Sequence, residues 1–246
     1  MVNIDRVYQK VLALTNKEQR GYITPQEFTL LANQAQMEIF EQYFYDIEQL
    51  GRAPSNDSEF SDRVTNVEEK LSYFQHNNQS ASISGGSVDF TSGTNLYKLG
   101  SVTVKYPSGI GFNRAERLTF DQFKLYETSP LTKGTLKKPY YTLASSSEVD
   151  EATPKLIGTF SPGITSGSEV KMSYTKSPGN VSWGYVVVQG KALYDPSKTS
   201  HFQLHKSEEV ELVYKILKLA GVTIQKTDIV QVGQGLEAAK IQQEKQ

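Results

Sequence analysis

Cysteine is absent from this chain of 246 residues. Disulfides, zinc ribbons and thiol nucleophiles are therefore excluded as means of stabilising the fold or of catalysis. A globular chain of this length buries roughly 70% of the surface that its unfolded form exposes, so its fold needs neither a metal nor a disulfide. The lack of cysteine is typical of a protein that folds in a reducing cytoplasm.

The chain also has little net charge and no long apolar run. Lys and Arg number 26 and Asp and Glu number 27, for a formal net charge of -1. A general nucleic-acid binder needs a basic excess that these totals lack, although a local basic patch stays open. The polar residues 1–10 have no apolar signal-peptide core, and no run approaches the ~20 residues that cross a bilayer. We expect synthesis in the cytoplasm and no membrane contact.

Helical periodicity dominates both ends of the chain. Thr24-Pro25-Gln26-Glu27 predicts a helix start with a capping box, and that helix should run to about Leu50. Ser207 followed by two acids predicts another start, and Gly221 ends that helix. A third helix is expected at 60–74 and a last one at 227–246. The expected apolar stripes are Ile4, Val7, Tyr8, Val11 and Leu12, then Phe28, Leu31, Ala32, Ala35 and Ile39, then Val210, Val213, Tyr214 and Leu217.

The middle of the chain has a different texture. Residues 77–86 are rich in Ser, Asn and Gly and predict a linker or loop. From about residue 87 to 203, short alternating segments bounded by Gly, Pro or Ser predict strands, and Thr119 caps a short helix to Glu127. The clearest strands are 102–106, 141–143, 156–160, 170–174 and 185–188.

Together these patterns predict an α+β fold, in which a helical bundle from both chain ends carries an inserted antiparallel β-sandwich or small barrel. The expected parts are 1–78 (helical), 79–204 (β domain) and 205–246 (C-terminal helix and assembly arm). A bundle built from the N-terminal helices alone is the alternative.

Patterns that carry catalytic, cofactor or metal chemistry are weak or absent. Gly233 and Gly235 resemble a dinucleotide fingerprint, but the chain ends before a βαβ unit or a downstream acid can follow. His201 and His205 have the spacing of two metal ligands on a helix, yet no glutamate base lies between them, and we interpret them as exposed or capping. We therefore predict that the chain is not an enzyme and has no catalytic residues, cofactor or metal.

Two further features bear on partners. Lys133, Lys137 and Lys138 form the one basic cluster of the β part, which indicates either a solvated loop or contact with an acidic partner or nucleic acid. Tyrosine is common, with 14 residues against a single tryptophan, Trp183. Tyrosine suits surfaces that are half apolar and half wet, as interfaces are.

Three stretches in a fixed order resemble a family of structural proteins of tailed bacteriophages, including marine and crAss-like phages. The first covers residues 7–28 (VYQKVLALTNKEQRGYITPQEF) and runs on to Phe44. The second is residues 174–178 (YTKSP) followed by 183–185 (WGY). The third is 202–205 (FQLH), leading into 207–209 (SEE) and 212–221 (LVYKILKLAG).

The resemblance implies a subunit of a head-to-tail connector ring, either an adaptor or a portal-vertex protein, located in the virion neck or tail after assembly in the host cytoplasm. It implies a homo-oligomer, by the usual order of portals a 12-mer, that contacts the portal protein and other connector or tail proteins. DNA would pass through the lumen without tight, sequence-specific binding. The residues that we expect to contact partners are Trp183, Tyr185, Ile229, Val232, Leu236 and Ile241.

A function of another class remains open. The β domain with Trp183 and its tyrosines could be a carbohydrate-binding or host-attachment module of the tail. An exposed Trp183 in a groove would favour this alternative, and a buried Trp183 would favour the connector.

Overall fold

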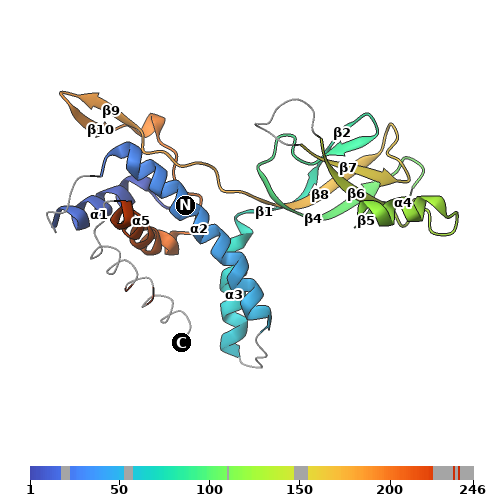
Figure 1. Ribbon diagram of the computed structural model, residues 1–246, viewed down its shortest axis with the longest axis horizontal. Helices are drawn as coiled ribbons and strands as arrows, with labels where there is room; N and C mark the ends of the chain where they lie inside the picture. The colour runs from blue at the N-terminus through green and yellow to red at the C-terminus, as the bar shows by residue number, and fades with distance from the viewer. Residues whose placement is uncertain are drawn as a thin grey trace. The chain divides into compact units, whose positions relative to one another are not determined.

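The computed structural model describes residues 1–17, 23–52, 58–109, 111–146 and 155–223, together with Gly235 and Ala238. Within these ranges the chain forms five α-helices and a mostly antiparallel sheet of eight strands, so the predicted α+β class is confirmed (Figure 1). Two compact units divide the chain. Met1–Tyr73 and Pro178–Gln246 make up one, here called the helical unit, and Phe74–Ser177 make up the other, the β unit.

The helical unit contains α1 (Ile4–Lys17), α2 (Pro25–Arg52), α3 (Ser58–Ser72) and α5 (Glu209–Thr223).

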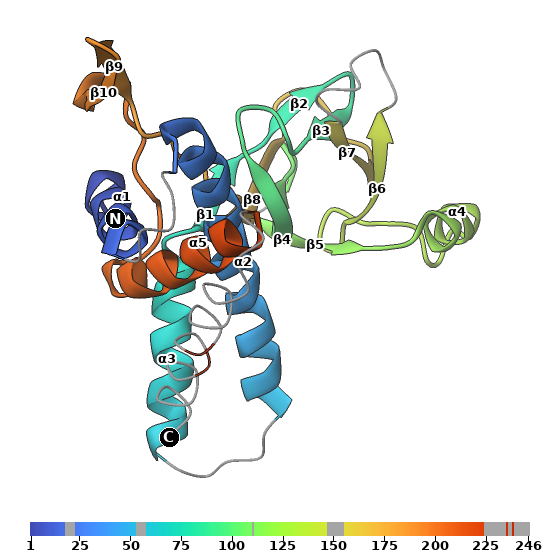
Figure 2. The same cartoon turned by 60° about the vertical axis from the view of Figure 1, so that its left-hand side comes forward.

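 The third of these, α3, spans Ser58–Ser72 and contacts α2, while α5 contacts both α1 and α2 (Figure 2). Two short 3-10 turns, η1 (Pro196–Lys198) and η2 (Lys206–Glu208), lie in the segment that leads to α5. None of the helices in the described ranges is both long and apolar enough to cross a membrane.

Most of the apolar stripes predicted for α1 and α2 are buried, and only Leu12 and Leu31 among their predicted members are half-buried. Residues with 3% exposure or less include Ile4, Val7, Tyr8, Val11, Phe28, Ala32, Ala35 and Ile39. The stripe predicted for α5 is wrong in part, because Val210 is 45% exposed while Leu212 and Ile216 are fully buried. A helix that contacts two others buries a wide band, and its centre cannot be found from spacing alone.

The predicted start of α2 is confirmed in detail. The backbone N–H of Thr24 donates to Glu27 Oε2 (2.9 Å), and the N–H of Glu27 donates to Thr24 Oγ1 (3.3 Å). At the other predicted start the cap is His205 and not Ser207, because the N–H of Ser207 donates to His205 Nδ1 (3.3 Å). The interpretation of His205 as a capping residue is therefore confirmed.

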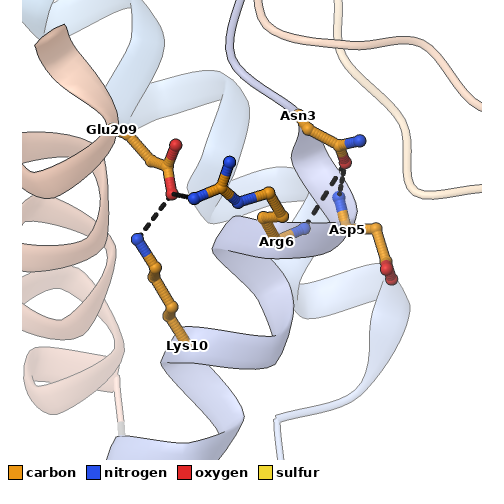
Figure 3. Close-up of polar contacts among 5 residues, drawn as sticks. All are labelled: Asn3, Asp5, Arg6, Lys10 and Glu209. Atoms are coloured by element: carbon orange, nitrogen blue, oxygen red, sulfur yellow. Dashed lines mark hydrogen bonds and ion pairs between the residues drawn. The ribbon is translucent and has the colours of Figure 1, made fainter. Parts of the chain in front are cut away.

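Charged contacts join α1 to the first residue of α5 and α3 to the η2 turn before it. Arg6 and Lys10 of α1 both contact Glu209 Oε1, at 3.3 and 2.5 Å (Figure 3). Lys70 Nζ of α3 lies 2.8 Å from Glu208 Oε1, and Glu208 is only 1% exposed. A buried carboxylate is tolerated when it is paired in this way, so Lys70 and Glu208 depend on each other.

The β unit is one sheet with the strand order β1-β8-β4-β5-β6-β7-β3-β2, in which only β5 and β6 run parallel. Its strands are β1 (Gln75–Ser80), β2 (Ser82–Ser84), β3 (Ser87–Asp89), β4 (Leu96–Lys105), β5 (Asn113–Arg117), β6 (Tyr140–Ser146), β7 (Lys155–Ser161) and β8 (Glu169–Lys176). The two end strands of this order, β1 and β2, are separated in the chain only by Ala81. One short connection therefore links both ends of the sheet and makes it nearly barrel-like.

The expectation of a linker or loop at 77–86 is wrong, because β1 and β2 occupy most of it. Both strands are edges of the sheet order, and nearly all of their side chains are exposed. Such strands need no apolar face, and polar residues are the usual protection of an edge. The strands predicted at 102–106, 141–143, 156–160 and 170–174 correspond to β4, β6, β7 and β8.

The core of the β unit gathers side chains from strands that are distant in the sheet order. Its buried members are Val88, Phe90, Val102, Val104, Tyr106, Ala115, Tyr141, Phe160, Ile164, Val170 and Met172. Outside this core lies α4 (Phe120–Thr128), which Thr119 caps as predicted. It contacts β6 through the ring of Phe123, which meets the ring of Tyr140 edge to face at 5.4 Å between centroids.

The division into units differs from the boundaries predicted at residues 78 and 204. Residues 178–204 belong with the helices, although they contain a strand pair that the sequence placed in the β domain. The reason lies in the contacts of this segment with α2, which also build the candidate site.

Candidate partner-binding surface

An extended segment, residues 179–183, lies along α2 and is held by its polar side chains. Asn33 Nδ2 donates to the carbonyl of Val181 (2.9 Å), and the N–H of Val181 donates to Asn33 Oδ1 (2.8 Å). One turn further on, Gln36 Nε2 donates to the carbonyl of Gly179 (2.9 Å). These amides supply the hydrogen bonds that a neighbouring strand would otherwise provide, so the segment stays extended without a sheet.

Trp183 follows this segment and is buried, with 5% of its surface exposed. Its Nε1–H donates to Asp5 Oδ1 of α1 at 3.0 Å. Its ring lies 4.7 Å from that of Tyr8 and 5.8 Å from those of Tyr185 and Tyr194, measured between centroids. An indole that is enclosed by three rings and bonded through its only donor is a fixed structural anchor.

After Trp183 the chain enters a narrow neck. Ser182 and Ser200 exchange two backbone hydrogen bonds of 3.1 and 2.9 Å. At Gly184 any Cβ would lie 2.7 Å from the carbonyl oxygen of Asp195, so glycine is required there. The hydroxyl and the backbone N–H of Ser197 donate to the Asp195 carboxylate and lower its pKa. The neck is therefore tightly bonded just before the exposed strands begin.

Beyond the neck lies a β-hairpin formed by β9 (Tyr185–Val188) and β10 (Lys191–Tyr194). Gln189 and Gly190 connect the strands with φ angles of 50° and 77°. Two positive φ angles match a type I′ turn, whose twist fits the flanking strands. The ribbon views show the hairpin projecting from the helices of its unit (Figures 1 and 2).

The hairpin carries apolar side chains on both faces. Val186 and Leu193 are cross-strand partners and are 43% and 53% exposed, while Val187 on the opposite face is 63% exposed. Since alternate residues of a strand point to opposite faces, burying one face would leave the other in water. We call Val186, Val187, Val188 and Leu193 the hairpin patch.

Both outer edges of the hairpin are also open, because no other strand in the described ranges pairs with β9 or β10. An isolated two-stranded hairpin is marginal in water. The Trp183 anchor fixes its base, but its outer half gains little from its own subunit. A partner that covers the hairpin patch or adds a strand to an edge would supply what the subunit lacks.

The structure brings two of the predicted contact residues together, since Trp183 and Tyr185 stack with an interplanar angle of 23°. Trp183 is internal, and Tyr185 is half-buried at the base of the hairpin. The other four predicted residues, Ile229, Val232, Leu236 and Ile241, lie outside the described residues. The basic residues Lys133, Lys137 and Lys138 belong to the β unit.

His201 and His205 have separate roles. The N–H of Ile4 donates to His201 Nδ1 (3.5 Å), and His205 caps η2. Among the residues that the structure describes, no group of three or more His, Cys, Asp or Glu could hold a metal ion.

Sequence reasoning missed the residues that hold the hairpin in place. Thr29, Asn33 and Gln36 recur at the spacing of one helix face, and all three bond the 179–183 segment. Gln36 is only 2% exposed, and a buried polar side chain needs a hydrogen-bond partner. Polar residues at i, i+4 and i+7 beside an apolar stripe therefore indicate that another segment lies against that face of the helix. The run Val186-Val187-Val188 was found as a strand, but its exposure could not be seen in the sequence.

No protein-family model and no curated protein sequence matches this chain.

Proposed function

We propose that this chain is a structural subunit of a closed homo-oligomeric ring in the head-to-tail connector of a tailed bacteriophage. The ring would lie between the portal protein and the tail, with a lumen through which DNA passes. Its subunits would be held by surface contacts with copies of the same chain and with neighbouring connector or tail proteins. The resemblance of the three sequence stretches sets the biological context of this proposal.

The hairpin patch is the observation that carries the proposal. Four large apolar side chains project from a rigid neck, and they are 43–63% exposed. Burying one such side chain stabilises a complex by ~1.5–3 kcal/mol at most. A preorganised base reduces the entropy that binding must offset. This geometry suits a protein that works by joining other subunits.

Two finer features belong to the same proposal. The helices from the two chain ends form a single bundle, supported by the contacts of α5 with α1 and α2. The sheet of the β unit closes as a small barrel, supported by the Ala81 connection between its end strands. A subunit with two separately folded parts can contact different neighbours through each part.

The carbohydrate-binding alternative lacks its main requirement. A sugar-binding tryptophan offers an open ring face, whereas Trp183 is 5% exposed and packs among tyrosines. Its Nε1–H is also bonded to Asp5. Trp183 therefore acts within the fold and gives no platform for a glycan.

The proposal is tested with two variants in the hairpin patch, Val187→Lys and Leu193→Lys, each supplied to growing phage as the only copy of the chain. Leu14→Lys is the matched control, since Leu14 is also an exposed apolar residue, at 44%, but lies on α1. We expect both hairpin variants to fold, with unchanged circular dichroism, and to be lost from purified particles. The control should be incorporated like the wild type.

The outcomes separate the parts of the proposal. Normal incorporation of both hairpin variants would show that the hairpin is not an assembly contact. Particles that hold a single copy of the wild-type chain, or none, would overturn the ring itself.

A further inference from the structure

Among the residues of the β unit that the structure describes, the most exposed large apolar side chains lie in α4 and the turn after it, residues 120–138, here called the α4 lobe. Leu131 is 97% exposed, Leu125 is 68% exposed and Phe120 is 61% exposed. All three lie within one short segment of the chain, although Phe120 and Leu125 are on different faces of α4. Large apolar side chains that are exposed together in one segment make it a candidate interaction site.

The lobe is rigid in spite of its exposure. The N–H groups of Thr132 and Lys133 both donate to the carbonyl of Ser129 (3.2 and 3.1 Å), and the hydroxyl of Thr132 donates to the carbonyl of Tyr126 (3.1 Å). At Gly134 a Cβ would lie 2.1 Å from the carbonyl oxygen of Ser161, so the turn is pressed against the sheet. Leu131 is thus held out by its own backbone.

The same segment has an excess of positive charge. Lys124, Lys133, Lys137 and Lys138 are all exposed, against only Asp121 and Glu127 in the same segment. Among the described residues, none of the four lysines forms an ion pair. Lys124 Nζ lies over the ring of Phe120, 5.6 Å from its centroid. The lobe therefore carries exposed leucines together with lysines that lack an anionic partner, which suits a partner that is both apolar and acidic.

The rest of the same chain has the opposite charge. The β unit has 11 Lys and Arg against 8 Asp and Glu, a net charge of +3. The helical unit holds the remainder of the totals of 26 and 27, which is 15 against 19 and a net charge of -4. A net charge near zero for the whole chain thus conceals two units of opposite sign, and opposite signs favour contacts between copies.

A matching surface lies on the outer face of α2. Leu30, Gln34, Glu38, Glu41 and Tyr45 follow at intervals of four, four, three and four, so they form one stripe. Leu30 is 72% exposed and Tyr45 is 62% exposed, and the two carboxylates lie between them. This outer α2 stripe combines acidic and apolar groups, as the lobe requires.

We propose that the α4 lobe of one copy docks on the outer α2 stripe of the next copy. Leu131 and Leu125 would pack beside Tyr45, and the lysines would face Glu38 and Glu41. The contact uses different surfaces on the two copies, and repeated contacts of this type close into a ring when their rotation allows. This inference rests on the proposed ring and names the surfaces that join its subunits.

Other occupants fit the lobe less well. A DNA backbone satisfies lysines but offers no apolar pocket for a leucine side chain. An anionic membrane would accept the leucines, but it would repel Asp121 and Glu127 in the same short helix. The second copy supplies both kinds of group on one rigid helix.

The absence of native cysteine makes a clean cross-linking test possible. Full-length Leu131→Cys and Tyr45→Cys chains are prepared separately, mixed at high concentration and treated with a short bismaleimide. Both residues are exposed, so the substitutions should not disturb folding. We expect cross-linked dimers from the mixture and few from either variant alone. A mixture of Leu131→Cys with Leu14→Cys is the matched control and should yield few dimers.

Charge reversal gives a second readout. We expect Lys133→Glu with Lys137→Glu to weaken self-association about tenfold or more, and Glu38→Lys with Glu41→Lys to do the same. Combining all four substitutions in one chain should restore most of the loss. Restoration would not occur if these residues merely kept the subunit soluble.

Several results would overturn the inference. Dimers from Leu131→Cys alone would indicate a symmetric contact between two lobes. Rings without mixed dimers would show that other surfaces join the copies, and the proposed ring would then stand without this contact. The chain could instead bind duplex DNA or phosphatidylserine vesicles at micromolar concentration. If Lys133→Glu with Lys137→Glu abolished that binding, the lobe would belong to another partner. If neither rings nor mixed dimers form, both the inference and the proposed function fail.

Discussion

The hydrogen bond between Trp183 and Asp5 can be tested by two substitutions of Asp5. Asp5→Ala leaves the Trp183 Nε1–H without the acceptor that now lies at 3.0 Å. Asp5→Asn keeps a carbonyl oxygen at that place, and it removes the same charge from the first turn of α1. The difference between the two variants therefore isolates the hydrogen bond, because any effect of the charge on the helix dipole is common to both.

The expected magnitude follows from burial. A buried donor that loses its partner costs about 1–3 kcal/mol. Trp183 is 5% exposed but Asp5 is half-buried, so water would reach the indole in the Ala variant, and we place the cost at about 1–2 kcal/mol. With a urea dependence of about 2 kcal/mol per molar, the midpoint of unfolding should fall by roughly 0.5–1 M relative to Asp5→Asn.

The assay uses the intrinsic fluorescence of the chain. Trp183 is the only tryptophan, so its emission during a urea titration reports on the helical unit alone. Asp5→Asn should keep most of the wild-type midpoint. Equal midpoints for the Ala and Asn variants would show that the bond contributes nothing and would refute the description of Trp183 as an anchor.

Five further predictions concern other parts of the chain. Thr24→Ala should lower the free energy of unfolding by about 1 kcal/mol, measured by urea titration. The backbone and hydroxyl of Thr24 lower the pKa of Glu27 below its ordinary value of 4.5, so its stabilising effect should be complete above pH 4.5 and disappear as the pH falls through the lower folded pKa. Glu27→Gln should remove that dependence in the same titrations. Burial raises the pKa of Tyr106 to about 12, so the stability from the neutral phenol should be complete below pH 10 and lost as the pH rises through 12, and Tyr106→Phe should reduce this alkaline loss. The isolated chain should bind duplex DNA more weakly than micromolar in 0.15 M salt, measured by fluorescence anisotropy. Deletion of residues 227–246 should leave circular dichroism and melting near normal and prevent entry into the ring, whereas an unfolded product would place this segment in the core.

The helices could be predicted because their signals are local. Thr24 and Glu27 are three residues apart, and their capping box forms as their spacing indicates. The stripes of α1 and α2 follow from a fixed helical period. The α5 stripe was partly misplaced because it depends on which helices α5 contacts, and that is a property of tertiary packing.

The edge strands and the hairpin could not be predicted in the same way. β1 and β2 are exposed edge strands made almost entirely of polar residues. They lack the alternation of apolar and polar residues from which a strand is predicted. β9 was found from its valines, yet its place in the helical unit depends on Asn33 and Gln36, which are about 150 residues away in the chain. Strand propensity is a property of one segment, whereas the elements against which that segment packs are determined by long-range contacts.

In the candidate site, too, the sequence indicates some residues and the fold alone indicates others. Trp183 and Tyr185 belong to the stretch 183–185 that carries the resemblance, and their rings stack on each other. Their neighbour Val187 carries more of the exposed surface, at 63%. An alternating or continuous run of valines looks the same in a core and on a surface, so only the fold reveals which one applies.

The most direct test of the central proposal is a reconstruction of the phage particle neck by electron cryomicroscopy, with this chain located by its fold. We predict a closed ring of about twelve copies around a channel, with the hairpin patch covered by an adjacent protein. A single copy, an open fibre, or a ring in which Val187 and Leu193 face solvent would contradict the account.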